Sequence, residues 1–297
     1  MESESGMRIL EPGLRRVIAP NPSPMTAQGT NTYLLGEGEV AVIDPGPDMP
    51  AHLDAILAAL APGERIGAIL VTHSHRDHSP LARSLAQHSG APVMAAGPSD
   101  WGRSATMAAL AAAGAVGGGE GVDPDFAPDH RIGEGEIIAG PWGEIAVLHT
   151  PGHMANHLSF AWQGALFTGD LVMGWSTSLV SPPDGDMGAF MRSCARLLGR
   201  DDRVYFPGHG AAVDAPQARV DSLIAHRLRR EEQIIAALSA QPGATASALA
   251  GTIYTDLAPA LLPAAARNVL AHLIDLSERN IATPEGNLTA AAPFSLR

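Results

Sequence analysis

The run THSHRDHSP at residues 72–80 constrains this chain more than any other stretch. It follows IGAILV at residues 66–71, a short apolar run that predicts a buried strand. Four side chains able to bind a metal therefore come directly after a strand: His73, His75, Asp77 and His78. Alternate side chains of an extended segment point the same way, so the first two histidines reach one point and the following turn directs the other two groups to a second point. Imidazole and carboxylate ligands suit zinc, with iron or manganese as alternatives.

Three later segments repeat this pattern of an apolar run, a turn and a candidate ligand. They are VLHTPGH at 147–153, ALFTGD at 165–170 and VYFPGH at 204–209, and their candidate ligands are His153, Asp170 and His209. One Pro-Gly-His sequence carries little weight alone. Four such strand ends in one chain indicate a metal site built from all of them.

The four motifs, HxHxDH, TPGH, TGD and PGHG, resemble those of the metallo-beta-lactamase superfamily of binuclear metallohydrolases. The resemblance covers residues 1–210 and implies a four-layer αββα sandwich of the α/β class with two zinc ions. It implies that one metal is held by His73, His75 and His153. It also implies that Asp77, His78 and His209 hold the other metal, with Asp170 as the bridge.

Two further segments narrow the resemblance to one branch of the superfamily. GTNTYLL at 29–35 and PDGDM at 183–187 are similar to the beta-lactamase-like protein 2 branch, which is close to glyoxalase II. Phe190 stands where that branch is expected to carry a tyrosine, which argues against a phenol contact with substrate there.

The same branch appends a winged-helix module at its C-terminus, and the end of this chain fits that description. Helical patterns are followed by two short strands around a Gly286 turn. The predicted helices cover 216–240, 246–253 and 264–280, and the predicted strands cover 281–283 and 288–290. We therefore predict a metallo-beta-lactamase-type hydrolase domain over residues 1–213 and a winged-helix domain over 214–297.

Local signals predict the remaining elements of the first domain. A hairpin is predicted over 31–44, strands at 92–95, 137–138, 145–148, 158–162 and 165–167, and a helix over 51–60. Ser79 is predicted to cap the next helix with Pro80 at its first position, and Asp214 to cap the helix at 216–240. Residues 105–121 are rich in Ala and Gly and predict a helix that decays into a loop without chemistry.

Several residues near the ligands are candidates for supporting roles. Asp44 closes another strand and is predicted to cap the turn, a position also compatible with hydrogen bonding to a ligand. His157 is predicted either to hydrogen-bond a ligand or to contact substrate, while His149 is interpreted as structural. The long loop 173–187 beside Asp170 predicts a lid facing the substrate, with Ser176 and Thr177 as candidate contacts.

Charge argues against tight binding of long nucleic acids. The net charge is -12, and residues 1–213 hold 12 Arg against 23 acidic residues. The predicted helix at 264–273 has a single arginine, too few for a recognition helix. The only basic cluster, Arg227, Arg229 and Arg230, adjoins two glutamates and predicts a solvated helix face.

The first residues, the lengths of the apolar runs and the cysteine content indicate the compartment and the partners of this chain. The first six residues are polar and acidic, unlike a signal peptide, and no apolar run reaches the ~18 residues of a membrane span. Cys194 is the single cysteine and is predicted to be a core residue, so no disulfide forms within the chain. We expect a cytoplasmic protein with a small-molecule substrate and no membrane partner. Single-stranded RNA is the alternative partner, and a homodimer is the alternative to a monomer.

These observations predict a zinc-dependent hydrolase of a small ester, thioester or lactone. A metal-bridging hydroxide would attack the substrate, Asp170 would hold the metal pair and Asp77 would orient the nucleophile. One alternative is an endoribonuclease that cleaves single-stranded RNA, and another is a mononuclear iron oxidoreductase resembling persulfide dioxygenases. Metal content separates the last from the others. A non-catalytic nucleic-acid-binding module is disfavoured because every expected ligand is present.

Overall fold

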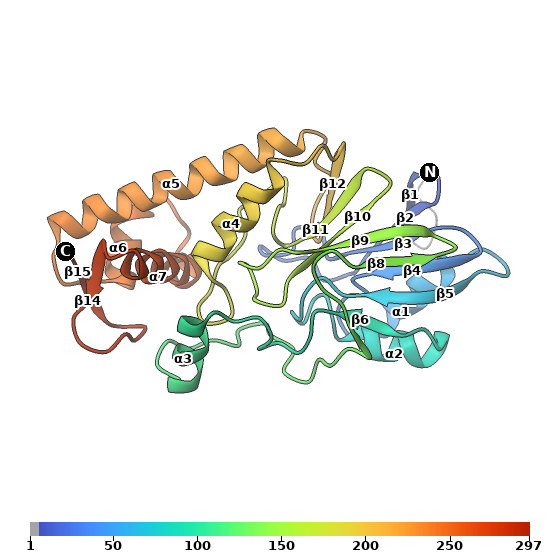
Figure 1. The fold of residues 1–297 in the computed structure, drawn as a ribbon, viewed down its shortest axis with the longest axis horizontal. Helices are drawn as coiled ribbons and strands as arrows, with labels where there is room; N and C mark the ends of the chain where they lie inside the picture. Colours follow the sequence, from blue (N-terminus) through green and yellow to red (C-terminus); the bar gives the residue numbers. More distant parts are fainter. Residues whose placement is uncertain (1–5) are drawn as a thin grey trace.

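A computed structural model describes residues 6–297, whose strands form three sheets. The first sheet has seven strands in the order β1-β2-β3-β4-β5-β6-β7 (Figure 1). Its strands are β1 (Met7–Glu11), β2 (Leu14–Ile18), β3 (Asn31–Leu35), β4 (Glu39–Ile43), β5 (Arg65–Leu70), β6 (Val93–Ala95) and β7 (His130–Arg131). The second sheet has five strands in the order β12-β11-β10-β9-β8. They are β8 (Ile137–Gly140), β9 (Gly143–His149), β10 (Leu158–Trp162), β11 (Ala165–Gly169) and β12 (Val204–Pro207).

The two sheets face each other across an apolar core. In β3, Tyr33 and Leu35 point into this core while Leu34 points to the opposite face, as the period of two in a strand requires. The core is aromatic near its centre, where the ring of Tyr33 packs edge-on against Phe167 at 5.0 Å between centroids. Burial on both faces explains why β3 and β11 are buried along their whole length.

Helices cover both outer faces and complete the predicted four-layer αββα sandwich. The helices α1 (Pro50–Ala58) and α2 (Leu81–Ser89) pack on the first sheet through side chains such as Ile56 and Leu85. On the second sheet lie α4 (Met187–Leu197) and the first half of α5 (Pro216–Ala240), which contribute Phe190 and Leu223 to a third cluster.

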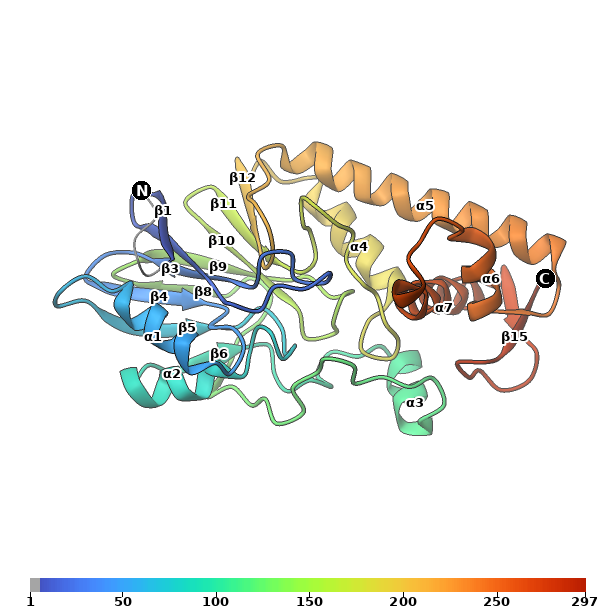
Figure 2. The ribbon, with the colours of Figure 1, turned by 180° about the vertical axis from the view of Figure 1, so that it is seen from behind.

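The end of the chain forms the predicted winged helix. It contains the second half of α5, β13 (Ala244–Thr245), α6 (Ala246–Ile253), the short 3-10 helix η1 (Pro259–Leu261), α7 (Leu262–Glu278), β14 (Ala282–Pro284) and β15 (Pro293–Leu296). The small sheet has the order β13-β15-β14. The helix α3 (Ala105–Ala113) also packs into the apolar core of the winged helix, through Met107 and Leu110. Figure 2 shows it beside α7.

Three local predictions are wrong. Pro80, not Ser79, occupies the N-cap position of α2, and the Ser79 hydroxyl instead donates to the carboxylate of Asp123. Ala215 precedes α5 without any side-chain cap, so Asp214 does not cap that helix. The second strand of the wing is β15 and not residues 288–290, because full burial of Phe294 in the small core selects the later segment.

The basic cluster on α5 is also not the solvated face that the sequence predicts. Arg229 is exposed, but Arg227 is only 1% exposed and lies beneath α4 and α7. Its guanidinium lies 5.0 Å from the centroid of the Phe190 ring. Phe190 is fully buried by this packing, so it has no exposed surface with which to contact a substrate.

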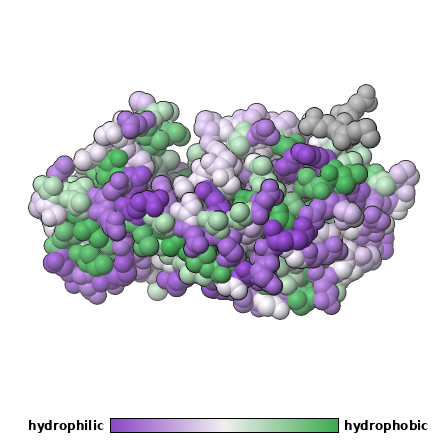
Figure 3. Space-filling view, turned by 90° about the horizontal axis from the view of Figure 1, so that it is seen from above, coloured by the Kyte–Doolittle hydropathy of each residue, from purple (hydrophilic) through white to green (hydrophobic). Residues whose placement is uncertain are grey.

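Hydrophilic and hydrophobic residues alternate in small groups over the face of the molecule seen in Figure 3. Within residues 6–297, every helix is too short or too polar to cross a lipid bilayer.

Candidate metal centre

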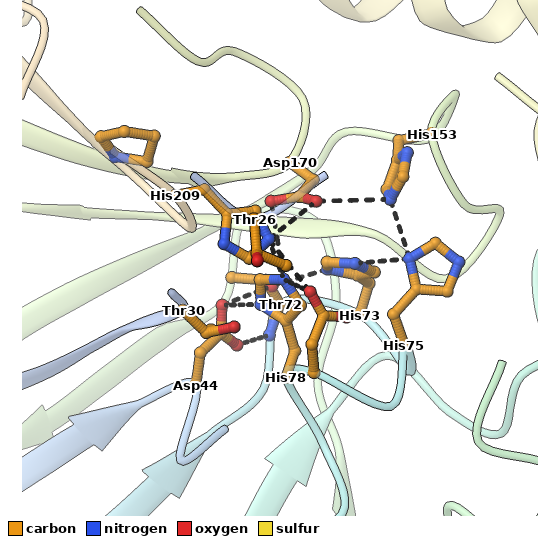
Figure 4. A network of polar contacts seen from close by, with 12 residues as sticks. Thr26, Thr30, Asp44, Thr72, His73, His75, His78, His153, Asp170 and His209 are labelled. Carbon is orange, nitrogen blue, oxygen red and sulfur yellow. Dashed lines mark hydrogen bonds and ion pairs between the residues drawn. The ribbon is translucent and has the colours of Figure 1, made fainter. Parts of the chain in front are cut away.

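All seven predicted ligands lie at one edge of the two facing sheets. Figure 4 shows six of them, and the seventh, Asp77, lies beside His78 and His209. The loop after β5 carries the HxHxDH residues, and the segments after β9, β11 and β12 carry His153, Asp170 and His209. Because β11 and β12 are parallel neighbours, their carboxyl ends bring the last two ligands together. His75 and Asp77 are partly exposed and the other five ligands are buried, so the site opens to solvent on the HxHxDH side.

One group of three imidazoles converges on a single point. The Nδ1 atom of His75 lies 3.0 Å from Nε2 of His73 and 2.9 Å from Nε2 of His153. The carboxylate of Asp170 lies 3.7 Å from the same nitrogen of His153. This is the set of residues expected to hold the first metal.

A second group lies on the other side of Asp170. Asp77 Oδ2 is 3.0 Å from Nε2 of His209 and 3.6 Å from Nε2 of His78. Asp170 reaches both histidines, with Oδ2 3.4 Å from His209 and Oδ1 3.5 Å from His78. The carboxylate of Asp170 therefore stands between the two groups, as a bridging ligand would.

The outward-facing nitrogens of two histidines have partners that assign their tautomers. The hydroxyl of Thr72 donates to Asp44 Oδ2 at 2.8 Å, so it must accept the hydrogen bond from His73 Nδ1 at 2.9 Å. The carboxylate of Asp44 accepts from Nδ1 of His78 at 2.9 Å. In both rings the proton on Nδ1 is directed outward, which leaves Nε2 of His73 as a bare lone pair toward the centre.

Backbone carbonyls fix the other two rings in the same way. His153 Nδ1 donates to the carbonyl of Leu179 at 2.6 Å, and His209 Nδ1 donates to the carbonyl of Gly29 at 3.3 Å. A carbonyl can only accept, so both rings also direct Nε2 inward. Histidine ligands of metals are characteristically oriented by such outer partners.

The nitrogen and oxygen atoms that face the centre lie close together, and a bound cation would stabilise this arrangement. Nε2 of His78 and Nε2 of His209 are 3.2 Å apart and cannot both direct protons at each other. Oδ1 of Asp170 is buried without a hydrogen-bond partner among the described residues. Converging imidazole nitrogens beside a buried carboxylate oxygen that lacks a hydrogen bond are the donor set of a metal site, so these residues fit metal ions.

The pKa values of two of these histidines are raised, because the nearby carboxylates favour positive charge in the site. Burial alone would lower the pKa of His78, but the carboxylates of Asp77, Asp170 and Asp44 outweigh it and raise the pKa to about 9. For His209 burial is again opposed, mainly by Asp170 and Asp77, and the pKa rises to about 11. By contrast, burial and neighbouring imidazoles lower the pKa of His75 to about 3.

Comparison with known proteins places this geometry in a family. Residues 25–209 match the metallo-beta-lactamase superfamily, and residues 245–289 match the beta-lactamase associated winged helix domain. The chain belongs to the metallo-beta-lactamase superfamily. The resemblance predicted from the motifs is thereby confirmed.

Individual superfamily members are similar over most of the chain. A beta-lactamase-like protein 2 homolog of Drosophila melanogaster is 31% identical over 278 residues, which cover 89% of this chain and 87% of the relative. An atrochrysone carboxyl ACP thioesterase of Aspergillus fumigatus is 32% identical over 238 residues, covering 77% of this chain and 66% of the relative. A crystal structure of a metallo-beta-lactamase family protein from Thermus thermophilus is 25% identical, with a TM-score of 0.77 and coverage of 97% and 100%.

Two of the predicted supporting residues lie within this superfamily site. Asp44 accepts from the backbone N–H and the hydroxyl of Thr72 as well as from His78, so it both caps the turn and orients a proposed ligand. His157 is fully buried; its Nε2 accepts from the backbone N–H of Asp170 at 3.2 Å. Between the two roles predicted for His157, the structure favours support of the ligands over contact with substrate.

The other candidates lie further out or have structural roles. Ser176 and Thr177 are partly exposed, and the carbonyl of Ser176 accepts from Arg219 at 2.6 Å, but neither is hydrogen-bonded to a ligand within the described residues. His149 bonds the carbonyl of Ala155 at 3.0 Å, as expected of a structural histidine. Cys194 is fully buried in the cluster between α4 and the second sheet, and burial raises the pKa of its thiol to about 12.

Some supporting groups were not predicted. The side-chain amide of Asn31 donates at 2.9 Å to the carbonyls of Pro207 and Gly210 and so holds the loop that carries His209. Thr72 precedes the first histidine directly, and that position was the one available signal for its role. The loop at 114–122 also adjoins the site, because the backbone of Val122 pairs with His75.

Proposed function

We propose that this protein is a hydrolase with two metal ions that cleaves a small thioester, within the wider class of small esters, thioesters and lactones. The observation that carries the proposal is the convergence of inward-facing imidazole nitrogens on both sides of the Asp170 carboxylate. Membership of a metallohydrolase superfamily and similarity to an ACP thioesterase support the choice of reaction and substrate. We propose zinc as the metal, because imidazole and carboxylate ligands suit it, with iron and manganese as alternatives.

The chain's own residues would divide the work of such a reaction. His73, His75 and His153 would hold one ion, and Asp77, His78 and His209 would hold the other, with Asp170 shared. Bound metal ions supply a Lewis acid for the substrate carbonyl and lower the pKa of water toward neutrality. Asp77 is partly exposed, so its carboxylate is placed to orient the attacking water from the open side of the site. Asp44, Thr72 and the two backbone carbonyls hold the Nδ1 atoms of four rings, so that Nε2 of each ring faces the metal positions.

Features of the C-terminal domain favour a small substrate over long nucleic acid. In a winged helix that reads nucleic acid, the recognition helix must enter a groove. Here the second half of α7 is largely buried, including Leu270, Leu273 and Ile274. An acidic first domain weakens electrostatic attraction to phosphates further.

The test is hydrolysis of a short acyl thioester of a pantetheine-like thiol by the zinc-loaded protein, with release of the thiol as the readout. Asp170→Ala is expected to lose roughly 100-fold or more in rate together with bound metal, because the shared ligand is gone. Asp221→Ala is the matched control, because Asp221 is exposed on α5 and makes no side-chain hydrogen bond or ion pair within the described residues.

Parallel measurements separate the alternatives. Cleavage of labelled single-stranded RNA that is lost in Asp170→Ala, without thioester turnover, would replace the proposed substrate with RNA. One iron per chain with oxygen consumption would indicate an oxidoreductase instead.

A further inference from the structure

Arg227 on α5 is a buried cation, and burying a charged side chain has a free-energy cost. Among residues 6–297 it forms no ion pair, and its Nε atom has no hydrogen-bond partner. Burial lowers the pKa of its guanidinium to about 10. Burying a charge without a carboxylate partner opposes folding, so the remaining contacts of this side chain are informative.

Those contacts lead to the lid loop. One terminal nitrogen of Arg227 donates to the carbonyl of Ser178, and the other donates to Oδ1 of Asn268 on α7 at 3.3 Å. The same Oδ1 of Asn268 accepts from the backbone N–H of Val180 at 3.0 Å. Arg227 on α5 and Asn268 on α7 therefore hold the backbone on both sides of Leu179.

The peptide unit between Leu179 and Val180 transmits this hold to the metal centre. A peptide unit is planar and trans, so the carbonyl of Leu179 and the N–H of Val180 belong to one rigid plane and point in opposite directions. Asn268 binds the N–H end of that plane, and His153 Nδ1 donates to its carbonyl end at 2.6 Å. Fixing one end fixes the direction of the other.

We propose that Arg227 and Asn268 are positioning residues for the metal ligand His153. They set the orientation of the Leu179–Val180 peptide. Its carbonyl accepts the Nδ1 proton of His153, which keeps the ring in that tautomer and directs Nε2 inward. This gives the winged-helix domain a place in the metal centre and removes the need for it to bind nucleic acid. The inference rests on the metal site proposed above.

The experiment compares two substitutions of Asn268, one that keeps the accepting oxygen and one that removes it. Asn268→Asp keeps an oxygen that accepts from Val180 and faces Arg227, whereas Asn268→Ala removes it. Both lose the amide's weak bond to Ala264, which is 3.4 Å long. Arg227→Met removes the guanidinium at nearly constant length, and Arg229→Met is its control because Arg229 is exposed on the same helix.

Zinc affinity is measured by competition with a chelator, and folding is followed by thermal unfolding. We expect Asn268→Ala and Arg227→Met to bind zinc roughly tenfold more weakly, the lower end of the loss seen when outer partners of a ligand are removed. Asn268→Asp and Arg229→Met should match wild type. Wild-type affinity in folded Asn268→Ala and Arg227→Met would overturn the proposal, as would equal losses in Asn268→Asp and Asn268→Ala.

A second readout does not depend on metal. In protein labelled with 15N-histidine and freed of metal, the Nδ1 proton of His153 should give a protected resonance in wild type and Asn268→Asp. In Asn268→Ala that resonance should broaden through exchange. Failure of wild type to bind metal would refute the metal site alone, while an unchanged resonance in Asn268→Ala would refute the positioning role alone.

Discussion

The hydroxyl of Thr72 connects Asp44 and His73 through two hydrogen bonds. It donates to Asp44 at 2.8 Å and accepts from His73 at 2.9 Å, while Asp44 also holds His78. The hydroxyl is fully buried, so no water can replace it without rearrangement. One hydroxyl therefore supports a histidine of each proposed metal.

Replacing this hydroxyl by a methyl group should weaken metal binding without preventing folding. We expect Thr72→Val to bind zinc roughly tenfold more weakly, because His73 loses the acceptor that fixes its tautomer. Thr72→Ser keeps the hydroxyl and should stay close to wild type in the same chelator competition. Equal affinities in the Val and Ser variants would mean that the hydroxyl does not orient His73.

His272 on α7 provides a test of stability against pH. Its ring is 1% exposed, and neither nitrogen has a hydrogen-bond partner among the described residues. Burial and the nearby arginines lower its pKa to about 3, below the ordinary value of 6.5. The lowered pKa means that folding favours the neutral ring, so the contribution is complete above pH 6.5 and is lost as pH falls toward 3.

Removing this histidine should flatten the acid limb of the stability curve. The titration costs the wild type about 2 kcal/mol at pH 5, which His272→Leu avoids. The loss of Tm between pH 7 and pH 5 should therefore be smaller in His272→Leu, with His52 retaining part of the slope because burial lowers its pKa to about 4. Identical pH profiles would show that His272 does not titrate in this way.

At the residue scale, the ligands were predictable and several of their partners were not. Every ligand lies in a segment that directly follows a strand, so local sequence carries the signal. The carbonyls of Leu179 and Gly29 carry none, because every residue has one. Arg227 lies in a charged run that suggests a solvated face, and only the packing of α4 and α7 over α5 buries it.

At the scale of elements, the turn between β12 and His209 depends on Gly208. A Cβ atom built there would lie 2.6 Å from both Oδ1 of Asp170 and Cε1 of His78. Two proposed ligands from different elements thus close against this one glycine. No side chain fits without moving them.

Gly208→Ala should therefore damage the metal centre more than the fold. We expect zinc affinity to fall at least tenfold, because the added methyl displaces two proposed ligands. Gly251→Ala is the matched control, because a Cβ at this position of α6 meets no atom within 4 Å. It should leave metal binding unchanged and stabilise the helix by up to about 1 kcal/mol. Wild-type affinity in Gly208→Ala would show that the turn is pliable.

The elements that sequence patterns misplaced are those whose position depends on distant packing. Strands β5, β9, β11 and β12 follow from continuous apolar runs. The wing strand β15 does not, because burial of Phe294 in the small core outweighs the local signal at 288–290. The helix α3 was predicted, but its packing against the winged-helix core has no local signature.

At the scale of the molecule, α5 belongs to both parts of the chain. Val220 and Leu223 near its start lie in the cluster over the second sheet, and Ile234 and Leu238 near its end lie in the winged-helix core. A boundary at residue 213 would therefore remove part of the helical layer over the second sheet. The two domains share the helix α5, and Asn268 of the second domain also binds the backbone of the loop 173–187.

A fragment ending at residue 213 should accordingly be poorly folded. We expect it to aggregate and to lose cooperative unfolding, because removing α5 exposes the apolar cluster that it covers. The same measurement on the full chain should show a cooperative transition. A soluble, cooperative and zinc-binding 1–213 fragment would show that α5 is dispensable to the hydrolase domain.

Calorimetric titration of metal-free protein with zinc tests the central claim most directly. The account predicts two zinc ions per chain, with proton release at pH 7 because the raised pKa values of His78 and His209 make those rings give up protons on binding. Asp170→Asn should lose tight binding of at least one ion. Binding of no zinc by the wild type, or stoichiometry and affinity unchanged in Asp170→Asn, would contradict a two-metal centre bridged by that carboxylate.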